Sequence, residues 1–278
     1  MPWTETTRRD YDRRSLRYAS DTTEAEWMLI EPFMPAPSRV GRPREVDLRE
    51  VWNAIQYIAA TGCQWAHLPK DFPPFTTVLY WFRRLRDEGV LDLANEMLVA
   101  AVRLTSGRNA NPTAGVIDSQ SVKTTESGGP CGYDAGKKIK GRKRHIVTDT
   151  QGNLLAGVVH KADIQDRDGA VGTIEEMQVS YPSIAYLFAD GGYAGDKLEL
   201  AMLNKDAPEI EIVRRPDEAK GFVVVARRWV VERTFAWLGR CRRLAKDWEK
   251  TIASSEAWML IASIRRTSRK LARDGYEF

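Results

Sequence analysis

The sequence is poor in cysteine and histidine, and both shortages narrow the chemistry open to it. Its 278 residues include three cysteines, which lie far apart and form no C-x-x-C pair. This usage indicates a reducing compartment and argues against a cysteine zinc site. There are three histidines and no H-x-x-x-H spacing. A cysteine or histidine constellation for covalent catalysis is therefore missing.

Long apolar runs are missing as well. No run approaches the roughly 18 residues of a membrane span, and residues 1–20 are charged throughout, unlike a signal peptide. We therefore expect a cytoplasmic protein with no membrane partner. Hydrophobic residues make up 43% of the chain and charged residues 29%, as in globular rather than disordered proteins. The length suits one large domain or two ordinary ones.

Positive charge is modest in total but strongly clustered. The net charge is +4, yet residues 137–144 (KKIKGRKR) hold six cations and no acid. Residues 227–250 hold eight Lys or Arg against three acids, and RRDYDRR and RRTSRK lie near the two ends of the chain. Basic clusters on a nearly neutral background indicate a polyanion partner. Any single cluster could instead be a solvated helix face.

The first hundred residues have helical patterns. Residues 1–19 are expected to form a flexible basic arm. Thr23 and Glu26 form a capping-box pattern, and a second helix with apolar spacing from Leu48 to Ile58 ends at Gly62. Further helices are predicted over about 77–88 and 91–104. Residues 20–105 thus predict a small helical, helix-turn-helix-like DNA-binding domain, although an ordinary packing domain has the same pattern. Its third helix carries cations off the apolar side: Arg83, Arg84 and Arg86.

A polar linker is predicted at 106–113, and the residue pattern changes after it. Short apolar strands are predicted at 114–118, 184–188 and 209–213, and residues 144–149 and 153–162 form a predicted hairpin. Helices are expected over about 167–178, 195–204, 225–246 and 255–273. This mixture predicts an α/β domain over 106–278 with a mixed sheet, in the element order of a ribonuclease-H-like fold.

Two aspartates follow apolar strands. Asp118 ends GVID, and Asp190 ends LFAD just before two glycines. Alone, Asp190 is as well explained by a turn as by a site. If the two strands are parallel neighbours, both carboxylates meet at one sheet edge, where ligands bind in open α/β sheets. Such oxygen ligands suit Mg²⁺.

A third carboxylate comes from the predicted helix over 225–246. Glu232 shares one face of that helix with Arg228, Arg243 and Lys246. Taken alone, Glu232 is better explained by an ordinary surface ion pair with Arg228. The competing acids fit a hairpin turn or capping positions before a helix. These are Asp149, Asp163, Asp166 and Asp168.

Three long segments resemble the catalytic segments of DDE-type bacterial transposases of the insertion-sequence-five family. They are VIDSQSVKTTESGGPCGYDAGKKIKGRKRHIVTDT, LFADGGYAGDK and RWVVERTFAWLGRCRRLAKDWE. The part from TTEAEWMLIEPFMP to YWFRRLRD is similar to the helical domain that precedes catalysis in those enzymes. The resemblance covers about residues 20–250. It implies a ribonuclease-H-like catalytic domain with Asp118, Asp190 and Glu232 as the catalytic, metal-binding triad.

The resemblance also implies cofactors and partners. Two Mg²⁺ ions per site, for which Mn²⁺ can substitute, would serve phosphodiester hydrolysis and strand transfer at terminal inverted repeats. The expected partner is double-stranded DNA, bound by a homodimer or larger multimer at the bacterial nucleoid. In the family signature Tyr-x2-Arg-x3-Glu-x6-Lys, Val225 and Gly239 depart from Tyr and Lys, so Arg240 or Lys246 is expected to replace the lysine. The predicted DNA contacts are Arg228, Arg240, Arg243, Lys246, Lys137, Lys138, Lys140, Arg142, Lys143, Arg83, Arg84 and Arg86.

Two other functions remain open on the same residues. A non-catalytic DNA-binding regulator would keep the fold without turnover. A structure-selective ribonuclease-H-like nuclease would cut DNA without regard to inverted repeats.

Overall fold

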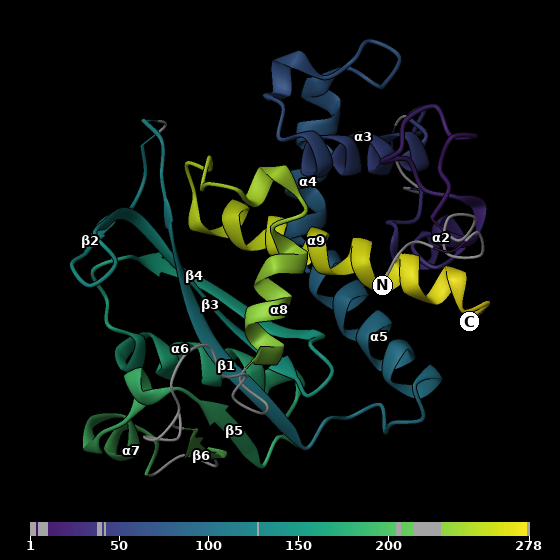
Figure 1. Ribbon diagram of the computed structural model, residues 1–278. Coiled ribbons are helices and arrows are strands. Elements are labelled where there is room, and N and C mark those ends of the chain that lie inside the picture. The colour runs from purple at the N-terminus through teal and green to yellow at the C-terminus, as the bar shows by residue number, and fades with distance from the viewer. Residues whose placement is uncertain are drawn as a thin grey trace.

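In a computed structural model, the middle part of the sequence forms a six-stranded mixed sheet (Figure 1). The structure describes residues 4, 11–37, 41, 43–126, 128–203, 207–213 and 229–276. The strands are β1 (Ala114–Lys123), β2 (Gly132–Asp134), β3 (Ile139–Asp149), β4 (Leu154–Lys161), β5 (Tyr186–Ala189) and β6 (Glu209–Ile212). Their order is β2-β3-β1-β5-β6, with β4 also paired to β3. The pairs among β1 to β4 are antiparallel, whereas β1–β5 and β5–β6 are parallel.

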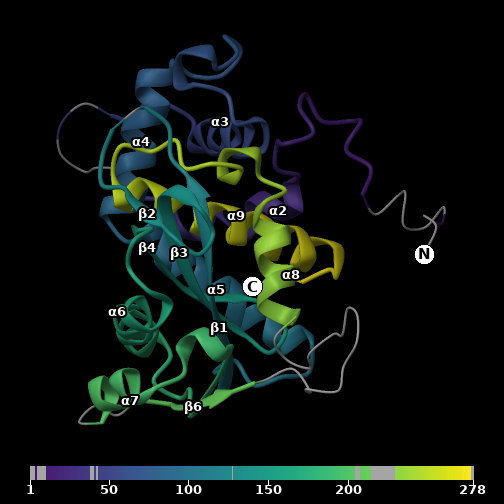
Figure 2. The ribbon, with the colours of Figure 1, turned by 60° about the vertical axis from the view of Figure 1, so that its left-hand side comes forward.

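Helices cover both faces of this sheet. Figure 2 shows α6 (Asp166–Ser180) on one side of β3 and β4, and α8 (Trp229–Leu238) on the other. Side chains alternate along each strand, so each face has its own core. Val116, Ile146 and Phe188 belong to the core on the α8 side, and Ile117 and Val147 to the core on the α6 side. The shorter helix α7 (Asp196–Met202) joins the second core.

The helical region before the sheet begins as the local sequence predicts. Its helices are α2 (Glu24–Met28), α3 (Leu48–Thr61), α4 (Phe75–Asp87) and α5 (Val90–Thr105). Both bonds of the predicted capping box between Thr23 and Glu26 are present. Gly62 follows α3 with φ of 71°, the left-handed conformation that favours glycine at a helix end.

The last helix returns to this first region. α9 (Ile252–Arg273) packs against α2, α3, α4 and α5 as well as β4 and α8 (Figure 1). Trp258 of α9 stacks on Phe82 of α4 with ring centroids 4.8 Å apart. One continuous core runs from Trp27 to Leu271. The boundaries at 19/20 and 105/106 stay predictions, and the helical layer contains α9 as well as α2 to α5.

Part of the predicted N-terminal arm lies outside the described residues. The part that is described contacts the first helices. Arg13 forms an ion pair with Glu26 at 2.6 Å, and Arg17 forms one with Glu50 at 2.8 Å. Among the described residues, no helix is long and apolar enough to cross a membrane.

Candidate functional site

Asp118 and Asp190 lie level with each other on neighbouring strands. β1 and β5 are parallel, with Val116 opposite Phe188, and each aspartate comes two residues later in its own strand direction. Asp190 has extended backbone angles (φ −85°, ψ 176°), so the alternation continues and both carboxylates belong to the α8 face. The expected meeting of these two acids at the end of β5 therefore agrees with the register.

The position of Asp118 in its strand differs from the prediction. β1 does not end at Asp118 but continues to Lys123, and Asp118 pairs with Ile146 of β3. The strand is longer because β3 is longer too and offers it a partner up to Gly141. It is the neighbour β5 that stops here, at Ala189. Asp118 thus lies where one side of β1 loses its partner strand.

Backbone amides hold both carboxylates. The N–H of Ser119 donates to Oδ1 of Asp118 at 2.7 Å, and the N–H of Gly192 donates to Oδ1 of Asp190 at 2.7 Å. Each of these bonds fixes the direction of its carboxylate. A Cβ added at Gly191 would meet no atom within 4 Å, so the residue that follows Asp190 borders open space. The site has oriented oxygens and room for a ligand.

Asp166, the first residue of α6, is a third acid near these two. It was predicted as a helix cap, but Gln165 is the cap residue, and Asp166 instead accepts from Ser119 Oγ at 2.7 Å. Lys143 forms an ion pair with Asp166 at 2.8 Å. A Cβ added at Gly192 would lie 3.0 Å from Oδ1 of Asp190 and 3.5 Å from Oδ2 of Asp166. The two carboxylates therefore flank the same glycine.

A buried phenol, Tyr193, is affected by the charges of all three aspartates. Burial raises the pKa of Tyr193 well above its usual range, and the negative charges of Asp118, Asp166 and Asp190 raise it further. Tyr193 therefore stays protonated and lies within the electrostatic reach of all three acids. The neighbouring sequence marks Tyr193 only through its place in FADGGYAG. Asp118 and Asp166, whose charges act on it, come from other elements.

Glu232 lies on α8, which packs along the same side of β1. Phe235 and Leu238 of α8 line a small cavity with Gln120 and Val122, which share the Asp118 face of β1. Glu232 is one turn before Phe235, toward the Asp118 end of the strand, and it is exposed. The structure thus places α8, the helix that carries Glu232, on the face of the sheet that carries Asp118 and Asp190.

The donor chemistry fits a hard divalent cation, since carboxylate oxygens border open space. The ligands are not gathered into a closed set, however. Within the described ranges, no group of three or more His, Cys, Asp or Glu side chains is placed to hold a metal ion. The metal-binding role of the triad stays a prediction.

The basic cluster 137–144 divides into two parts. Lys137 and Lys138 are exposed in the β2–β3 turn and Lys140 is exposed at the start of β3; Nζ of Lys137 lies 3.4 Å from the carbonyl oxygen of Ser119. The predicted role of the three lysines as DNA contacts stays a prediction.

Arg142 and Lys143 have a different place from the predicted one. Arg142 is fully buried and forms an ion pair with Asp247 at 3.1 Å. Lys143 is buried against Asp166 and also donates to the carbonyl of Ile164 at 2.7 Å. Both lie on β3 inside the sheet, where each forms an ion pair within the protein. We therefore do not assign them to DNA.

The predicted long helix also ends early. α8 stops at Leu238, and a turn leads to a short 3-10 helix, Arg242–Leu244. Arg243 is buried, with an ion pair to Glu249 at 2.6 Å, and is therefore not on the Glu232 face. Arg240 and Lys246 are exposed after the helix, and Arg228 lies outside the described residues.

On α4, Arg83 is exposed, whereas its two neighbours have acidic partners. Arg84 forms an ion pair with Glu88 at 2.7 Å, and Arg86 forms one with Asp87 at 2.7 Å. Arg83 is the α4 cation best placed for a DNA contact.

Comparison with known proteins identifies two families along the chain. Residues 109–265 match the family described as transposase DDE domain, and residues 22–95 match putative transposase of IS4/5 family. The putative transposase for insertion sequence element IS402 of Burkholderia cepacia is 31% identical over 119 residues. The similarity covers 40% of this chain and 54% of the relative, so it spans about half of the relative's length.

Proposed function

The chain belongs to the family of transposase DDE domains, whose match covers more than half of its length, and on that premise we propose an insertion-sequence transposase. It binds the terminal inverted repeats in double-stranded DNA, cleaves at the ends and transfers the 3′ ends to target DNA. The observation that supports this most directly is the level placement of Asp118 and Asp190 where β5 ends.

In this proposal Asp118, Asp190 and Glu232 hold the metal. Divalent ions, Mg²⁺ or Mn²⁺, would supply an activated water or DNA 3′-hydroxyl and stabilise the leaving oxygen. The amides of Ser119 and Gly192 each hold one carboxylate oxygen of the two aspartates, next to the open space at Gly191. Glu232 completes the set from α8. Lys137, at the rim beside Ser119, binds the phosphate that follows the scissile bond.

Exposed cations extend the DNA contact away from the site. Lys138 lies in the β2–β3 turn and Lys140 at the start of β3, Arg240 and Lys246 lie after α8, and Arg83 lies on α4. Pairing of two transposon ends requires at least a homodimer on DNA.

The substitution Asp190→Asn tests the catalytic assignment. The substrate is DNA with the inverted repeats that bound the gene, incubated with Mg²⁺. Cleavage should fall by more than about 100-fold. Removing a side chain that only supports a metal ligand costs about 10- to 100-fold, and Asp190 is proposed as a ligand itself. DNA binding without divalent ions should remain. The matched control is Asp196→Asn, an exposed aspartate six residues later, which should cleave like the wild type.

The alternatives give different results in the same assay. Equal cleavage by Asp190→Asn and wild type would refute the proposal. A wild-type protein that binds the ends but never cuts them is a regulator. Cleavage that ignores the repeat sequence identifies a nuclease.

A further inference from the structure

A cavity of about 670 Å³ lies on the far side of α8 from the helix face that packs on β1. Its walls come from α8, α9, the N-terminal segment at residues 11–13, α2 and the turn between β3 and β4. Its volume is in the usual range of ligand sites, about 300–1,000 Å³. Eight Lys or Arg residues line it, against one acid, Glu26. We call it the arginine pocket.

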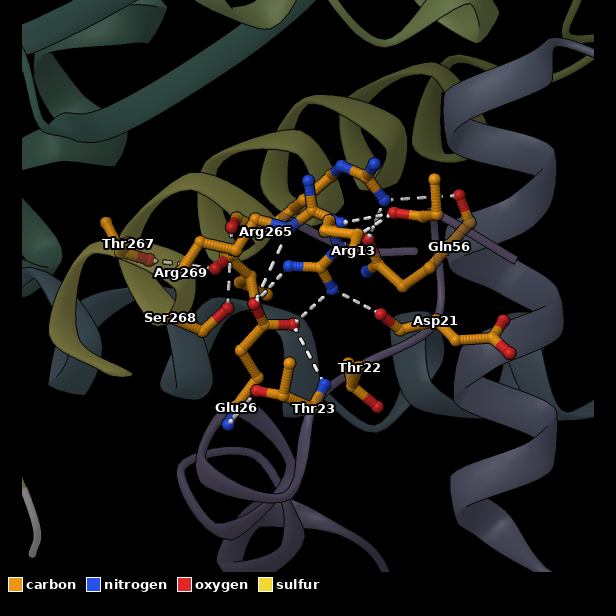
Figure 3. A network of polar contacts seen from close by, with 12 residues as sticks. Arg13, Asp21, Thr22, Thr23, Glu26, Gln56, Arg265, Thr267, Ser268 and Arg269 are labelled. Atoms are coloured by element: carbon orange, nitrogen blue, oxygen red, sulfur yellow. Dashed lines mark hydrogen bonds and ion pairs between the residues drawn. The ribbon is translucent and has the colours of Figure 1, made fainter. Parts of the chain in front are cut away.

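The single acid is shared by two of the arginines. Figure 3 shows Arg13 and Arg269 reaching Glu26 from different elements, at 2.6 Å and 3.9 Å. Arg265 donates to Gln56 at 3.0 Å, and Arg266 donates to Asn153 at 2.6 Å, both neutral groups. In the part of the chain that the structure describes, neither of these two has a carboxylate partner. The pocket therefore carries excess positive charge.

This crowding affects the arginines themselves. Burial, together with the nearby charges of Arg265 and Arg13, lowers the pKa of Arg269 to about 9. Burial likewise lowers the pKa of Arg266 to about 10. A free guanidinium has a pKa above 12. An anion in the pocket would stabilise the charged forms.

Aromatic rings alternate with the cations. The Arg233 guanidinium lies 4.1 Å from the ring centroid of Trp229 and 4.4 Å from that of Trp237. Arg266 lies 4.5 Å from the Trp237 ring, and Arg273 lies 4.5 Å from the Tyr11 ring. Interleaved arginines and aromatic rings are typical of surfaces that bind unpaired nucleic-acid strands. Guanidinium groups also match phosphate oxygens in pairs.

The pocket borders the helix of the proposed active site, because Arg233 follows Glu232 directly in α8. We propose that the arginine pocket binds the phosphates of an unpaired nucleic-acid strand that continues past the active site. The inference rests on the proposed function. Elements surround the pocket on several sides, and the Arg269 side chain is only 22% exposed. A flexible single strand can enter there, whereas a rigid duplex reaches only the rim at Arg240 and Arg273.

The first test removes the two rim cations. Arg240→Gln/Arg273→Gln is compared with Lys70→Gln/Lys161→Gln, which removes the same charge from exposed positions outside the pocket. Affinity for a fluorescent oligothymidine of about 20 nucleotides is measured by anisotropy in EDTA. The pocket pair should lose at least about tenfold, and its logarithmic salt dependence should become shallower by about one to two. Equal losses in both pairs would overturn the proposal.

A competition with inorganic triphosphate separates a strand from a small anion. At equal phosphate concentration, triphosphate should displace little of the oligothymidine from the wild type. If it displaces the oligothymidine fully, the pocket is a small-anion site and the proposal is wrong.

The second variant, Arg269→Gln, tests the inner wall. It should weaken oligothymidine binding more than binding of a blunt duplex of equal length, and a loss at least as large for the duplex would overturn the unpaired-strand assignment. Thermal unfolding checks the fold. If this variant is unfolded, Lys270→Gln replaces it. Nζ of Lys270 donates to Oγ of Ser106 at 3.0 Å and lies 3.9 Å from Oδ2 of Asp274.

The two proposals fail separately. Binding is measured without divalent ions, so Asp190→Asn should bind oligothymidine like the wild type. If Asp190→Asn still cleaves DNA, the catalytic assignment fails and the result for the pocket stands.

Discussion

Some residues of the candidate site can be recognised from the neighbouring sequence, whereas others depend on partners far away in the chain. Asp118 and Asp190 follow apolar runs, so local pattern predicts both. Asp166 does not stand out, because its partners are Ser119, 47 positions away, and Lys143. Local pattern explains an aspartate before a helix as a cap. The bonds of Asp166 to residues of other elements determine its role instead, and such bonds leave no pattern in the neighbouring sequence.

At this scale, Asp166→Asn should destabilise the protein by about 2–3 kcal/mol at neutral pH, because Lys143 and Ser119 lose a charged partner. Burial acts to raise the pKa of Asp166, but the bonds from Lys143 and Ser119 outweigh it and lower the pKa. A lowered pKa means stability that is present above the unfolded pKa of about 3.9 and lost as pH falls through the folded pKa. Urea unfolding between pH 3 and 7 should show the wild-type advantage shrinking below about pH 4.

Asp168→Asn is the control on the same helical turn. Asp168 pairs with Lys197 at 2.6 Å, and that lysine is 69% exposed. Surface pairs contribute at most about 1 kcal/mol. An equal effect of both variants would mean that the bonds of Asp166 contribute nothing special.

Among the elements, local sequence predicts helix ends better than strand lengths. The capping box before α2 and the glycine after α3 depend on neighbouring residues only, and both are as predicted. The strand predicted at 144–149 extends to Ile139. Three of the five added residues are charged, and Arg142 among them is buried because it donates to the carbonyls of Pro130 and Lys250. No propensity scale anticipates such distant acceptors.

The early end of α8 has a similar cause. The apolar and basic periodicity continues to Lys246, which favours a long helix. The chain instead turns after Leu238, and Arg243 reaches Glu249 and the carbonyl of Cys63 at 3.1 Å. Tertiary contacts outweigh local periodicity here.

Helix α6 allows a prediction with an internal control. A Cβ at Gly169 would lie 2.7 Å from Cε1 of His145 and closer still to Nε2 of His160, whose Nε2 lies 2.7 Å from Nδ1 of His145. Gly169→Ala should therefore cost about 1–3 kcal/mol by overpacking. Gly172 in the same helix has no atom within 4 Å of an added Cβ, so Gly172→Ala should stabilise by up to about 1 kcal/mol. Thermal unfolding of the two variants checks both signs, and a stabilising Gly169→Ala would contradict the packing.

For the molecule as a whole, the predicted fold class is confirmed: a helical region precedes a mixed sheet of the ribonuclease-H-like DDE family. The place of α9 was not predictable. Its apolar face is visible in the sequence, but periodicity does not say which elements cover it. The structure packs that face against helices that precede the sheet.

This packing predicts one cooperative unfolding transition. Circular dichroism and tryptophan fluorescence should give coincident curves, because one core joins both regions. Trp258→Ala should lower the stability by about 3–5 kcal/mol and shift both probes together. The control Trp248→Ala removes a tryptophan that is 39% exposed and should change little. Two separate transitions would show that the helical layer folds without α9.

The return of α9 to the first helices also sets an order of events at the ribosome. Domains usually fold from the N-terminus onward as they are synthesised. Here α2 to α5 are made first, but Trp258 and the rest of α9 reach them only after the whole sheet has left the ribosome. The nascent helices must keep apolar surface exposed throughout that interval. A chain interrupted before Ile252 would therefore leave both regions incomplete, so a translation product that stops early is a target for proteolysis rather than a half-active competitor for DNA.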